Sequence, residues 1–504
     1  MKYIFTLILL ILTTSINAEK VNTKVDWQEF NKASFQQAKQ QEKFILLDLV
    51  AVWCHWCHVM DNTTYQDDKV VALLNSHFIA TQADHDLRPD LAERYRDWGW
   101  PATIVMTSDG TEVVKRAGYI SPANMANLLQ TIIEDPSPES STLSLPKNLS
   151  KSPELSTKLV NQLKQMHLEA YDYELGGLKL NMKFLDSDSI EWDLELAQYG
   201  DAQAQQRVVQ TLEAAMQLID PEFGGAYQYS TYADWKNPHY EKIINTQYKY
   251  LLSYSKACQF LNKINYCDEA NKIASFLLEF LYSDEKGVFY TSQDADLNKG
   301  EKSHDYFKLK RQQRLALGTP KVDKHIYASH NGKVIAGFIH LFLATKNNTY
   351  LKPAIKAADW IIKNRSLETG GFKHDKRDTA GPYLADTLYM GRAFLLLYQA
   401  TDNEVYLMHS IKAAEFIQAH FKNPQGGLVS AVDNGTPTRP LPQIDQNIDA
   451  ARFLMNLYKV QKSDTLRELI IHSMKFLATE QITTARFTEA GVLLAHANYL
   501  KLFK

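Results

Sequence analysis

The stretch that most constrains the fold of this chain is a run of mostly branched apolar residues, 44–52, that leads into Cys-His-Trp-Cys-His-Val-Met at 54–60. A short apolar run of this kind is typical of a buried strand, and the pattern after it fits the start of a helix. Cysteines at that junction lie beside unpaired backbone N–H groups and the positive end of the helix dipole. Both features favour the thiolate, the reactive form of cysteine. We therefore predict that Cys54 is a redox nucleophile and that Cys57 is its resolving partner.

Three chemistries fit two cysteines followed by a histidine. The spacing C-x-x-C-H also serves covalent haem attachment, and it supplies half of a zinc site, although the sequence has no second pair to complete one. The surroundings instead resemble those of a thioredoxin dithiol. Asp48 lies six residues before Cys54, and Gly99-Trp100-Pro101 precedes another strand, as a cis-proline loop does. We expect a dithiol without a metal or other cofactor, in which Asp48 accepts the proton of the resolving thiol.

Two histidines and two tryptophans surround the sulfur atoms. A protonated imidazole near a thiolate lowers the pKa of the thiol, so His55 and His58 predict a more oxidising pair than one that encloses Gly-Pro. His58 could equally be a helix residue that faces solvent. Trp53 and Trp56 could form an apolar landing surface for a partner, or they could pack against a neighbouring domain.

Length, charge and the first residues set the wider expectations. A chain of 504 residues is too long for one ordinary core, and a net charge of −3 gives no basis for nucleic-acid binding. Residues 1–18 follow the order of a secretory signal peptide, with Lys2, an apolar stretch and Ile16-Asn17-Ala18. We expect cleavage there, no stable membrane insertion afterwards, and a periplasmic or secreted protein. An uncleaved anchor is the alternative.

The residues after the leader divide into two domains. Residues 19–135 alternate strand and helix patterns and predict a compact α/β unit, and the proline- and serine-rich segment 136–153 predicts a linker. Within the α/β unit the patterns predict helices over 27–40, 69–76 and 122–133 and strands over 44–52, 78–83, 102–107 and 112–117.

Residues 154–504 predict a mostly helical domain built from repeated hairpins. Glycine turns return after helix-like segments at 176–177, 224–225, 287, 370–371 and 426–427. One helical hairpin cannot bury its apolar stripe alone, so repeated hairpins must stack or close on themselves. Six hairpins closed into an (α/α)6 toroid fit the length best, and an open solenoid is the alternative. Cys258 and Cys267 flank a predicted turn between two helices, where they form either a structural disulfide or two buried thiols.

Motifs spread over nearly the whole mature chain resemble the family of thioredoxin-domain proteins related to spermatogenesis-associated protein 20 and bacterial YyaL-like proteins. The resemblance rests on Cys54–Met60, Arg88-Pro89-Asp90, Gly99-Trp100-Pro101, the block from Gly224 to Gln247, Asp294-Ala295-Asp296 and Ser329-His330-Asn331-Gly332. His330 stands where the family has tryptophan, and the family's aromatic stretch after Asp-Ala-Asp is missing. The resemblance implies a thioredoxin-like domain followed by one similar to six-hairpin glycosidases and N-acylglucosamine epimerases.

The loops at one end of such a toroid enclose a pocket. Paired carboxylates there would suit glycoside hydrolysis, and a histidine could move the proton in an epimerase. The same acidic residues could instead cap helices, and the histidines could be core residues. The candidate lining consists of Tyr227, Asp234, Trp235, His239, Glu241, Tyr290, Asp294, Asp296 and His330, with Tyr229 nearby.

Two functional hypotheses follow. The first is an exported thiol–disulfide oxidoreductase that acts on protein thiols, protein disulfides or a redox partner, with a helical domain that docks the substrate. The second is a carbohydrate-active or carbohydrate-binding protein in which the thioredoxin-like domain is mainly structural.

Overall fold

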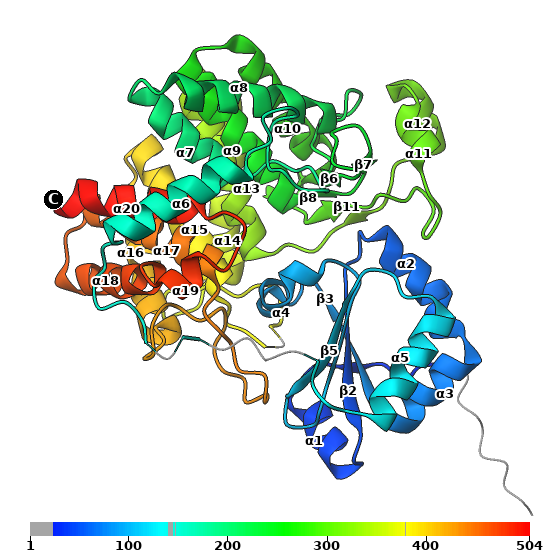
Figure 1. Cartoon of the computed structure of the whole chain (residues 1–504). Helices are drawn as coiled ribbons and strands as arrows, with labels where there is room; N and C mark the ends of the chain where they lie inside the picture. The colour runs from blue at the N-terminus through cyan, green and yellow to red at the C-terminus, as the bar shows by residue number, and fades with distance from the viewer. Residues whose placement is uncertain (1–23, 140–144, 147, 379) are drawn as a thin grey trace, which may run out of the picture.

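The computed structural model of this chain describes residues 24–139, 145–146, 148–378 and 380–504. An α/β domain is followed by a mostly helical domain, so the predicted fold class is confirmed (Figure 1). The predicted signal peptide, residues 1–18, lies outside the described residues. Within the described ranges, no helix is both long enough and apolar enough to cross a membrane.

A five-stranded sheet forms the centre of the first domain, in the order β1-β3-β2-β4-β5. The strands β1, β3 and β2 run parallel to one another, and β4 and β5 complete the sheet in antiparallel fashion. Their bounds are β1 (Gln28–Glu29), β2 (Phe44–Val50), β3 (Phe78–Asp84), β4 (Ala102–Met106) and β5 (Glu112–Ala117).

Helices cover both faces of this sheet, which explains why β2 reads as a continuous apolar run. Leu46 packs in the cluster formed with α3 and α5, whereas Ile45 and Leu47 pack in the cluster on the other face, with α1 and α4. The helical segments of the domain are α1 (Lys32–Gln40), α2 (His55–Asn62), η1 (Thr64–Gln66), α3 (Asp68–His77), α4 (Pro89–Arg94), η2 (Arg96–Trp98) and α5 (Pro122–Glu134).

The predicted helix over 27–40 is wrong at its beginning. Residues 28–29 form a short strand paired with β3, and the helix begins only at Lys32. Asn31 causes the late start, because its side chain accepts hydrogen bonds from the N–H groups of Ala33 and Ser34 and so caps the helix.

The second domain is a closed toroid of helical hairpins. Among the described residues, six helices form an inner ring in which each contacts the next: α7, α9, α13, α15, α17 and α20, which returns to α7. Six outer helices pack on this ring, so the predicted (α/α)6 toroid is confirmed and the open solenoid is excluded. The inner helices are α7 (Ser187–Gln198), α9 (Ile244–Leu261), α13 (Ala328–Thr345), α15 (Leu384–Thr401), α17 (Ile444–Val460) and α20 (Ala490–Phe503). The outer helices are α6 (Thr157–Ala170), α8 (Ala202–Ala215), α10 (Ile264–Phe276), α14 (Asn348–Arg365), α16 (Glu404–Phe421) and α18 (Asp464–Leu477).

Short strands and helices fill the connections between the hairpins. They build the loops at the end of the toroid where the inner helices begin. Their bounds are η3 (Met216–Leu218), β6 (Tyr229–Ser230), β7 (Pro238–His239), β8 (Lys242–Ile243), η4 (Leu277–Leu281), β9 (Tyr282–Ser283), β10 (Val288–Phe289), β11 (Ser292–Gln293), α11 (His304–Lys308), α12 (Arg311–Leu317), β12 (Val322–Asp323) and α19 (Glu480–Thr483).

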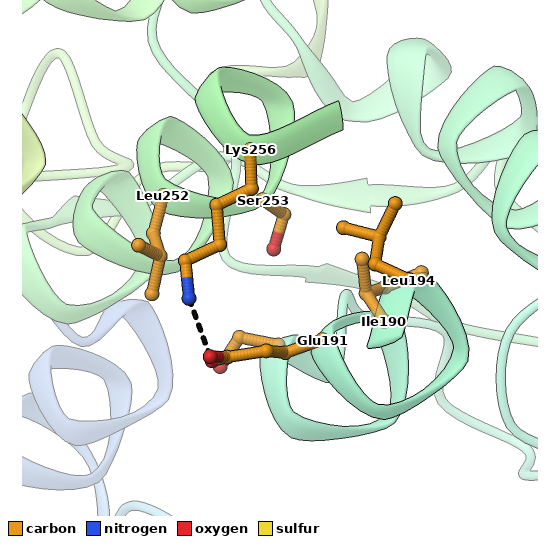
Figure 2. A pocket seen from close by; sticks show the side chains of 7 residues that line it. Ile190, Glu191, Leu194, Leu252, Ser253 and Lys256 are labelled. Carbon is orange, nitrogen blue, oxygen red and sulfur yellow. Dashed lines mark ion pairs between the residues drawn. The ribbon is translucent and has the colours of Figure 1, made fainter. Parts of the chain in front are cut away.

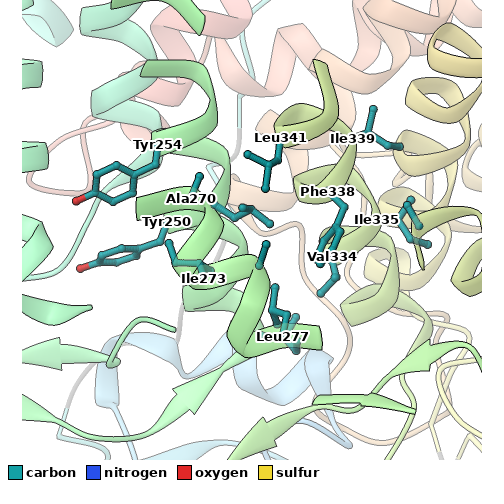
Figure 3. Packing of buried hydrophobic residues seen from close by; sticks show 14 of the residues in the cluster. Tyr250, Tyr254, Ala270, Ile273, Leu277, Val334, Ile335, Phe338, Ile339 and Leu341 are labelled. Carbon is teal, nitrogen blue, oxygen red and sulfur yellow. The ribbon is translucent and has the colours of Figure 1, made fainter. Parts of the chain in front are cut away.

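Apolar side chains fill the space between the inner and outer helices. Tyr250 and Tyr254 from α9, Ile273 from α10 and Phe338 from α13 belong to one such core cluster (Figure 3). Cys258 and Cys267 form a disulfide that joins α9 to α10, which is one of the two alternatives predicted from the sequence.

The glycine turns allow the hairpins to approach closely. Gly224 has a φ of +69°, and a Cβ atom at this position would overlap the carbonyl oxygen of Lys272 on α10. A side chain here would therefore push the turn away from its outer helix.

The α/β domain lies against the end of the toroid where inner helices begin, with α2 and α4 near the helical domain (Figure 1). His330, near the start of α13, faces Asp86 at 3.7 Å between Nε2 and Oδ1. Asp445, near the start of α17, pairs with Arg96 of η2. The loops that the sequence analysis assigned to a toroid pocket therefore meet the thioredoxin-like domain.

Candidate functional site

The two cysteines lie at the start of α2, where the sequence placed them. Cys54 is the N-cap residue of this helix and is joined to Cys57 by a disulfide bond. The Cys54 sulfur atom accepts a hydrogen bond from the backbone N–H of Cys57 at 3.2 Å. A negative charge on this sulfur would be stabilised by that N–H group and by the helix dipole.

Both cysteines are buried, which the sequence did not predict. The exposed fraction is 4% for Cys54 and 2% for Cys57. Ala51, Trp53 and Ile243 form the apolar cluster around them, and Ile243 belongs to β8 of the helical domain. Because thiol–disulfide exchange requires access to the attacking sulfur, a folded protein substrate can reach Cys54 only if the two domains separate.

Asp296 of the helical domain binds both histidines of the dithiol helix. Its Oδ1 lies 2.8 Å from Nδ1 of His55, and its Oδ2 lies 3.2 Å from Nδ1 of His58. Burial would raise the pKa of Asp296, but the hydrogen bonds to the two histidines outweigh it and lower the pKa to about 2. The two motifs, 54–58 and 294–296, are therefore parts of one site, although the sequence analysis assigned them to separate sites.

Three further predicted pocket residues gather beside this contact. Glu241 is buried, and its Oε2 has no hydrogen-bond partner among the residues that the structure describes; it lies 3.9 Å from Nδ1 of His239. Burial, together with the charges of Asp294 and Asp296, raises the pKa of Glu241 to about 8. Burial also raises the pKa of Asp294 to about 6 and lowers that of His239 to about 4. Tyr229 stacks on the His239 ring, with 4.2 Å between the ring centroids.

The structure does not bring Trp235 and Asp234 into this cluster. Trp235 is buried in the helical core, where its Nε1 donates to the carbonyl oxygen of Leu175 at 2.9 Å. Asp234 accepts from the backbone N–H of Lys236 at 2.8 Å and so stabilises its own turn. Both side chains are engaged in local structure.

Tyr227 and Tyr290 pack in apolar clusters and not among the carboxylates. Tyr227 packs in a buried cluster with Tyr306 and Phe307, and Tyr290 packs at the edge of the helical core. Their aromatic rings support the loops that carry the cluster.

His330 belongs to a second contact between the domains, centred on Asp86. Trp53 Nε1 donates to Asp86 Oδ2 at 2.8 Å, and His374 Nε2 donates to the backbone carbonyl of Asp86 at 2.6 Å. Burial opposes ionisation of Asp86, but His85 beside it lowers the pKa of Asp86 below its ordinary value. The sequence analysis missed Asp86 and His374. The signal for Asp86 was available, since a polar cluster at the carboxyl end of a central strand is a common functional position.

Asp48 and Pro101 occupy the places that the sequence analysis gave them. Asp48 is fully buried in β2, with Gln82 Nε2 donating to its Oδ2 at 3.0 Å. Burial raises the pKa of Asp48 to about 7. The Trp100–Pro101 bond is cis. A carboxyl group that titrates near neutrality is suited to exchange protons with a thiol.

Trp56 lies at the rim of the buried dithiol and is 37% exposed. Lys302 of the helical domain lies over its ring, 5.4 Å from the centroid. The side chain therefore meets both solvent and the neighbouring domain.

A small pocket lies between α7 and α9 inside the toroid (Figure 2). Glu191 and Lys256 form an ion pair of 2.5 Å in its lining, and Arg452 also pairs with Glu191. The pocket has essentially no room for a water molecule, so it is far smaller than the roughly 300–1,000 Å³ of ordinary small-molecule sites.

Two family models match the chain, one in each domain. The model described as "Protein of unknown function, DUF255" (Thioredox_DsbH) matches residues 12–135, and "Glycosyl Hydrolase Family 88" matches residues 300–432. Thioredoxin H-type from Fagopyrum esculentum is 33% identical over 91 residues, which are 18% of this chain and 73% of that protein.

Spermatogenesis-associated protein 20 from Homo sapiens is 26% identical over 307 residues, which cover 54% of this chain and 39% of that protein. The chain thus spans about two fifths of the length of that relative. An uncharacterized protein from Caenorhabditis elegans is 19% identical over 584 residues, which cover 89% of this chain and 80% of that protein.

Solved structures resemble the helical domain in fold. D-mannose isomerase superposes with a TM-score of 0.53 at 14% identity, covering 69% of this chain and 98% of the other. Cellobiose 2-epimerase from Spirochaeta thermophila gives the same TM-score at 11% identity, covering 69% of this chain and 97% of the other. At these identities the similarity establishes the toroid fold and nothing about substrate.

Proposed function

We propose that this chain, which belongs to the family of thioredoxin-domain proteins related to spermatogenesis-associated protein 20, exchanges thiols and disulfides through Cys54 and Cys57. The observation that carries the proposal is the position of Cys54 at the N-cap of α2, where its sulfur accepts the N–H of Cys57. The similarity to thioredoxin H-type over 91 residues and the buried Asp48 support it.

The exchange has two steps. In the reductive direction, the Cys54 thiolate attacks one sulfur of the substrate disulfide; the S–S bond breaks, a mixed disulfide forms, and the departing thiolate takes a proton. Cys57 then gives its proton to Asp48 and attacks the Cys54 sulfur, which releases the second substrate thiol. The substrate gains two electrons, and the Cys54–Cys57 disulfide forms. An external dithiol returns it to the reduced state.

The helical domain has a defined part in this proposal. Ile243 covers the sulfur atoms, and Asp296 holds His55 and His58 on the side of α2 that faces the toroid. Since both rings bind Asp296, the carboxylate would offset any positive charge on them, and we expect the helix start to make the main contribution to thiolate stability. We propose that movement of the helical domain determines which disulfides reach Cys54, and that the protein works in the periplasm or after secretion.

The Cys57→Ser variant tests the exchange reaction. Without the resolving thiol, the mixed disulfide at Cys54 cannot be released. We expect covalent adducts with a disulfide substrate that are stable in non-reducing gels and are released by dithiothreitol. The matched control is the double variant Cys54→Ser, Cys57→Ser, which should form none. Equal labelling of the two variants, or no adduct in either, would contradict the proposal.

A carbohydrate ligand for the toroid is a second candidate. It is favoured by the match to "Glycosyl Hydrolase Family 88". The charged side chains Glu191, Lys256 and Arg452 lie between the inner helices, where a sugar could bind only if the packed space opened. Thermal shift with mannose and cellobiose tests it. A rise in melting temperature that Glu191→Gln abolishes would support binding there, and no shift at millimolar sugar would remove this candidate.

A further inference from the structure

We propose that His58, Asp294 and Asp296 bind a divalent transition-metal ion between the two domains. One ligand atom from each of these buried residues lies within 4.8 Å of those from the other two. His58 comes from α2, and the two aspartates come from the loop after β11. The sequence predicted no metal because it has no second Cys-x-x-Cys and no His-x-x-x-His pattern, whereas the residues that the fold brings to His58 are distant aspartates.

The hydrogen bonds of His58 leave Nδ1 directed at Asp296, whereas the nearest contact of Asp294 is 4.0 Å, between its Oδ2 and Nε2 of His58. Its Nε2 lies 2.9 Å from the backbone carbonyl oxygen of Val52, which can only accept, so this nitrogen carries a hydrogen. Nδ1 then faces Asp296 Oδ2 at 3.2 Å. A lone pair on Nδ1 and a carboxylate oxygen can face each other only with a cation between them, either a proton or a metal ion. A histidine that donates to a backbone carbonyl through its other nitrogen is the usual arrangement of a metal ligand.

Glu241 is a further buried carboxyl group near the proposed site. Only 4% of this residue is exposed, and its Oε2 has no hydrogen-bond partner in the described part of the chain. The charges of Asp294 and Asp296 act directly on it. The ionised form of such a carboxyl group is unfavourable without a countercharge, so without a nearby cation Glu241 keeps its proton. A divalent ion held by His58, Asp294 and Asp296 would supply that countercharge from outside the Glu241 side chain.

The donor set narrows the choice of ion. One imidazole nitrogen with two or three carboxylate oxygens suits Mn²⁺, Fe²⁺ or Zn²⁺, whereas Ca²⁺ prefers six to eight oxygen ligands. Because the ligands come from both domains, the bound ion would hold α2 against the helical domain.

Isothermal titration of the full chain with Mn²⁺ and with Zn²⁺ tests the proposal. The protein is first treated with a chelator, and the Cys54–Cys57 disulfide is kept oxidised so that thiolates cannot bind zinc. We expect one ion per chain and a rise in melting temperature on binding. Asp294→Asn and His58→Gln should each weaken binding by at least about tenfold; glutamine retains a donor for the Val52 carbonyl.

Asp359→Asn is the matched control, because Asp359 is an aspartate on α14 that accepts a hydrogen bond from Tyr406 and lies outside the proposed site. It should bind the ion as the wild type does. The proposal is overturned if the wild type binds neither ion in a 1:1 ratio, or if both site variants bind as tightly as the control. The titration measures metal binding and not thiol–disulfide exchange. A negative result would therefore leave the proposed role of Cys54 untouched, since the Cys57→Ser variant tests that role separately.

Discussion

Asp48 shows how one residue can link stability to chemistry. Its carboxyl group lies in a central strand with no exposure to solvent, and Gln82 Nε2 donates a hydrogen bond to its Oδ2. The sequence predicted its place, because the short, branched apolar run around it is typical of a buried strand. The pairing of His55 and His58 with Asp296 was not predictable in the same way. These partners lie 241 and 238 residues apart, and no local pattern records which loop meets which helix.

Asp48→Asn should stabilise the oxidised protein at pH 8 and have little effect at pH 4. Burial raises the pKa of Asp48 from 3.8 to about 7. Between these values the unfolded chain ionises while the folded chain stays neutral, so the carboxyl group lowers stability as the pH rises to 7, and its penalty is constant above that. The asparagine variant lacks this penalty, which amounts to at most about 4 kcal/mol.

Denaturant unfolding of both proteins at pH 4, 6 and 8 measures the difference. If the asparagine variant gained the same free energy of unfolding at all three pH values, burial of the Asp48 carboxylate would not be the cause of the gain. The same variant should resolve the mixed disulfide on the order of 100-fold more slowly at pH 7, because Cys57 loses its proton acceptor.

At the scale of elements, α2 depends on its neighbours more than on its own sequence. The helix has eight residues and would be unstable alone; strand β2 positions its start, and Asp296 binds its outward face. Sequence periodicity predicted the long helices and strands, since each buries a continuous stripe. It missed α4 because six residues after a polar loop show no clear period, and it began α1 too early because tertiary pairing with β3 outweighed helix propensity.

The disulfide between α9 and α10 gives a prediction at this scale. Cys258 and Cys267 are nine residues apart, and closing a loop of that length stabilises a fold by about 2–3 kcal/mol through the entropy of the unfolded chain. The double variant Cys258→Ala, Cys267→Ala should therefore show a lower melting temperature for the helical domain in calorimetry. The control is the same double variant under dithiothreitol, which should melt where the reduced wild type melts. A variant that melts with the oxidised wild type would contradict the expected stabilisation.

For the whole molecule, the decisive feature is that one domain covers the reactive group of the other. The sequence predicted both domains and the dithiol, but it did not predict the docking that buries Cys54, because the docking depends on contacts distributed over both domains. His374 illustrates the point: it lies in the toroid, yet its Nε2 donates to the backbone of Asp86 beside the dithiol.

His374→Ala should increase exchange with a protein disulfide such as insulin several-fold and leave exchange with a small disulfide nearly unchanged. Loss of the contact to Asp86 favours separation of the domains, on which only the large substrate depends. The matched control is His472→Ala, which removes a histidine hydrogen bond to the carbonyl of Gly427 within the toroid. Similar acceleration in both variants, or with both substrates, would mean that general destabilisation and not domain docking is responsible.

The measurement that tests the central claim most directly is the rate at which iodoacetamide alkylates Cys54 in the reduced wild-type protein between pH 5 and pH 9, followed on the Cys54 peptide by mass spectrometry. Burial of Cys54 disfavours its thiolate form, whereas the N–H group of Cys57 and the start of α2 favour it. We expect the helix start and the N–H group to outweigh burial. We therefore predict a rate that has nearly reached its plateau by pH 7. A rate that still rises about tenfold per pH unit through pH 8, as for an ordinary thiol with a pKa near 8.5, would contradict this prediction.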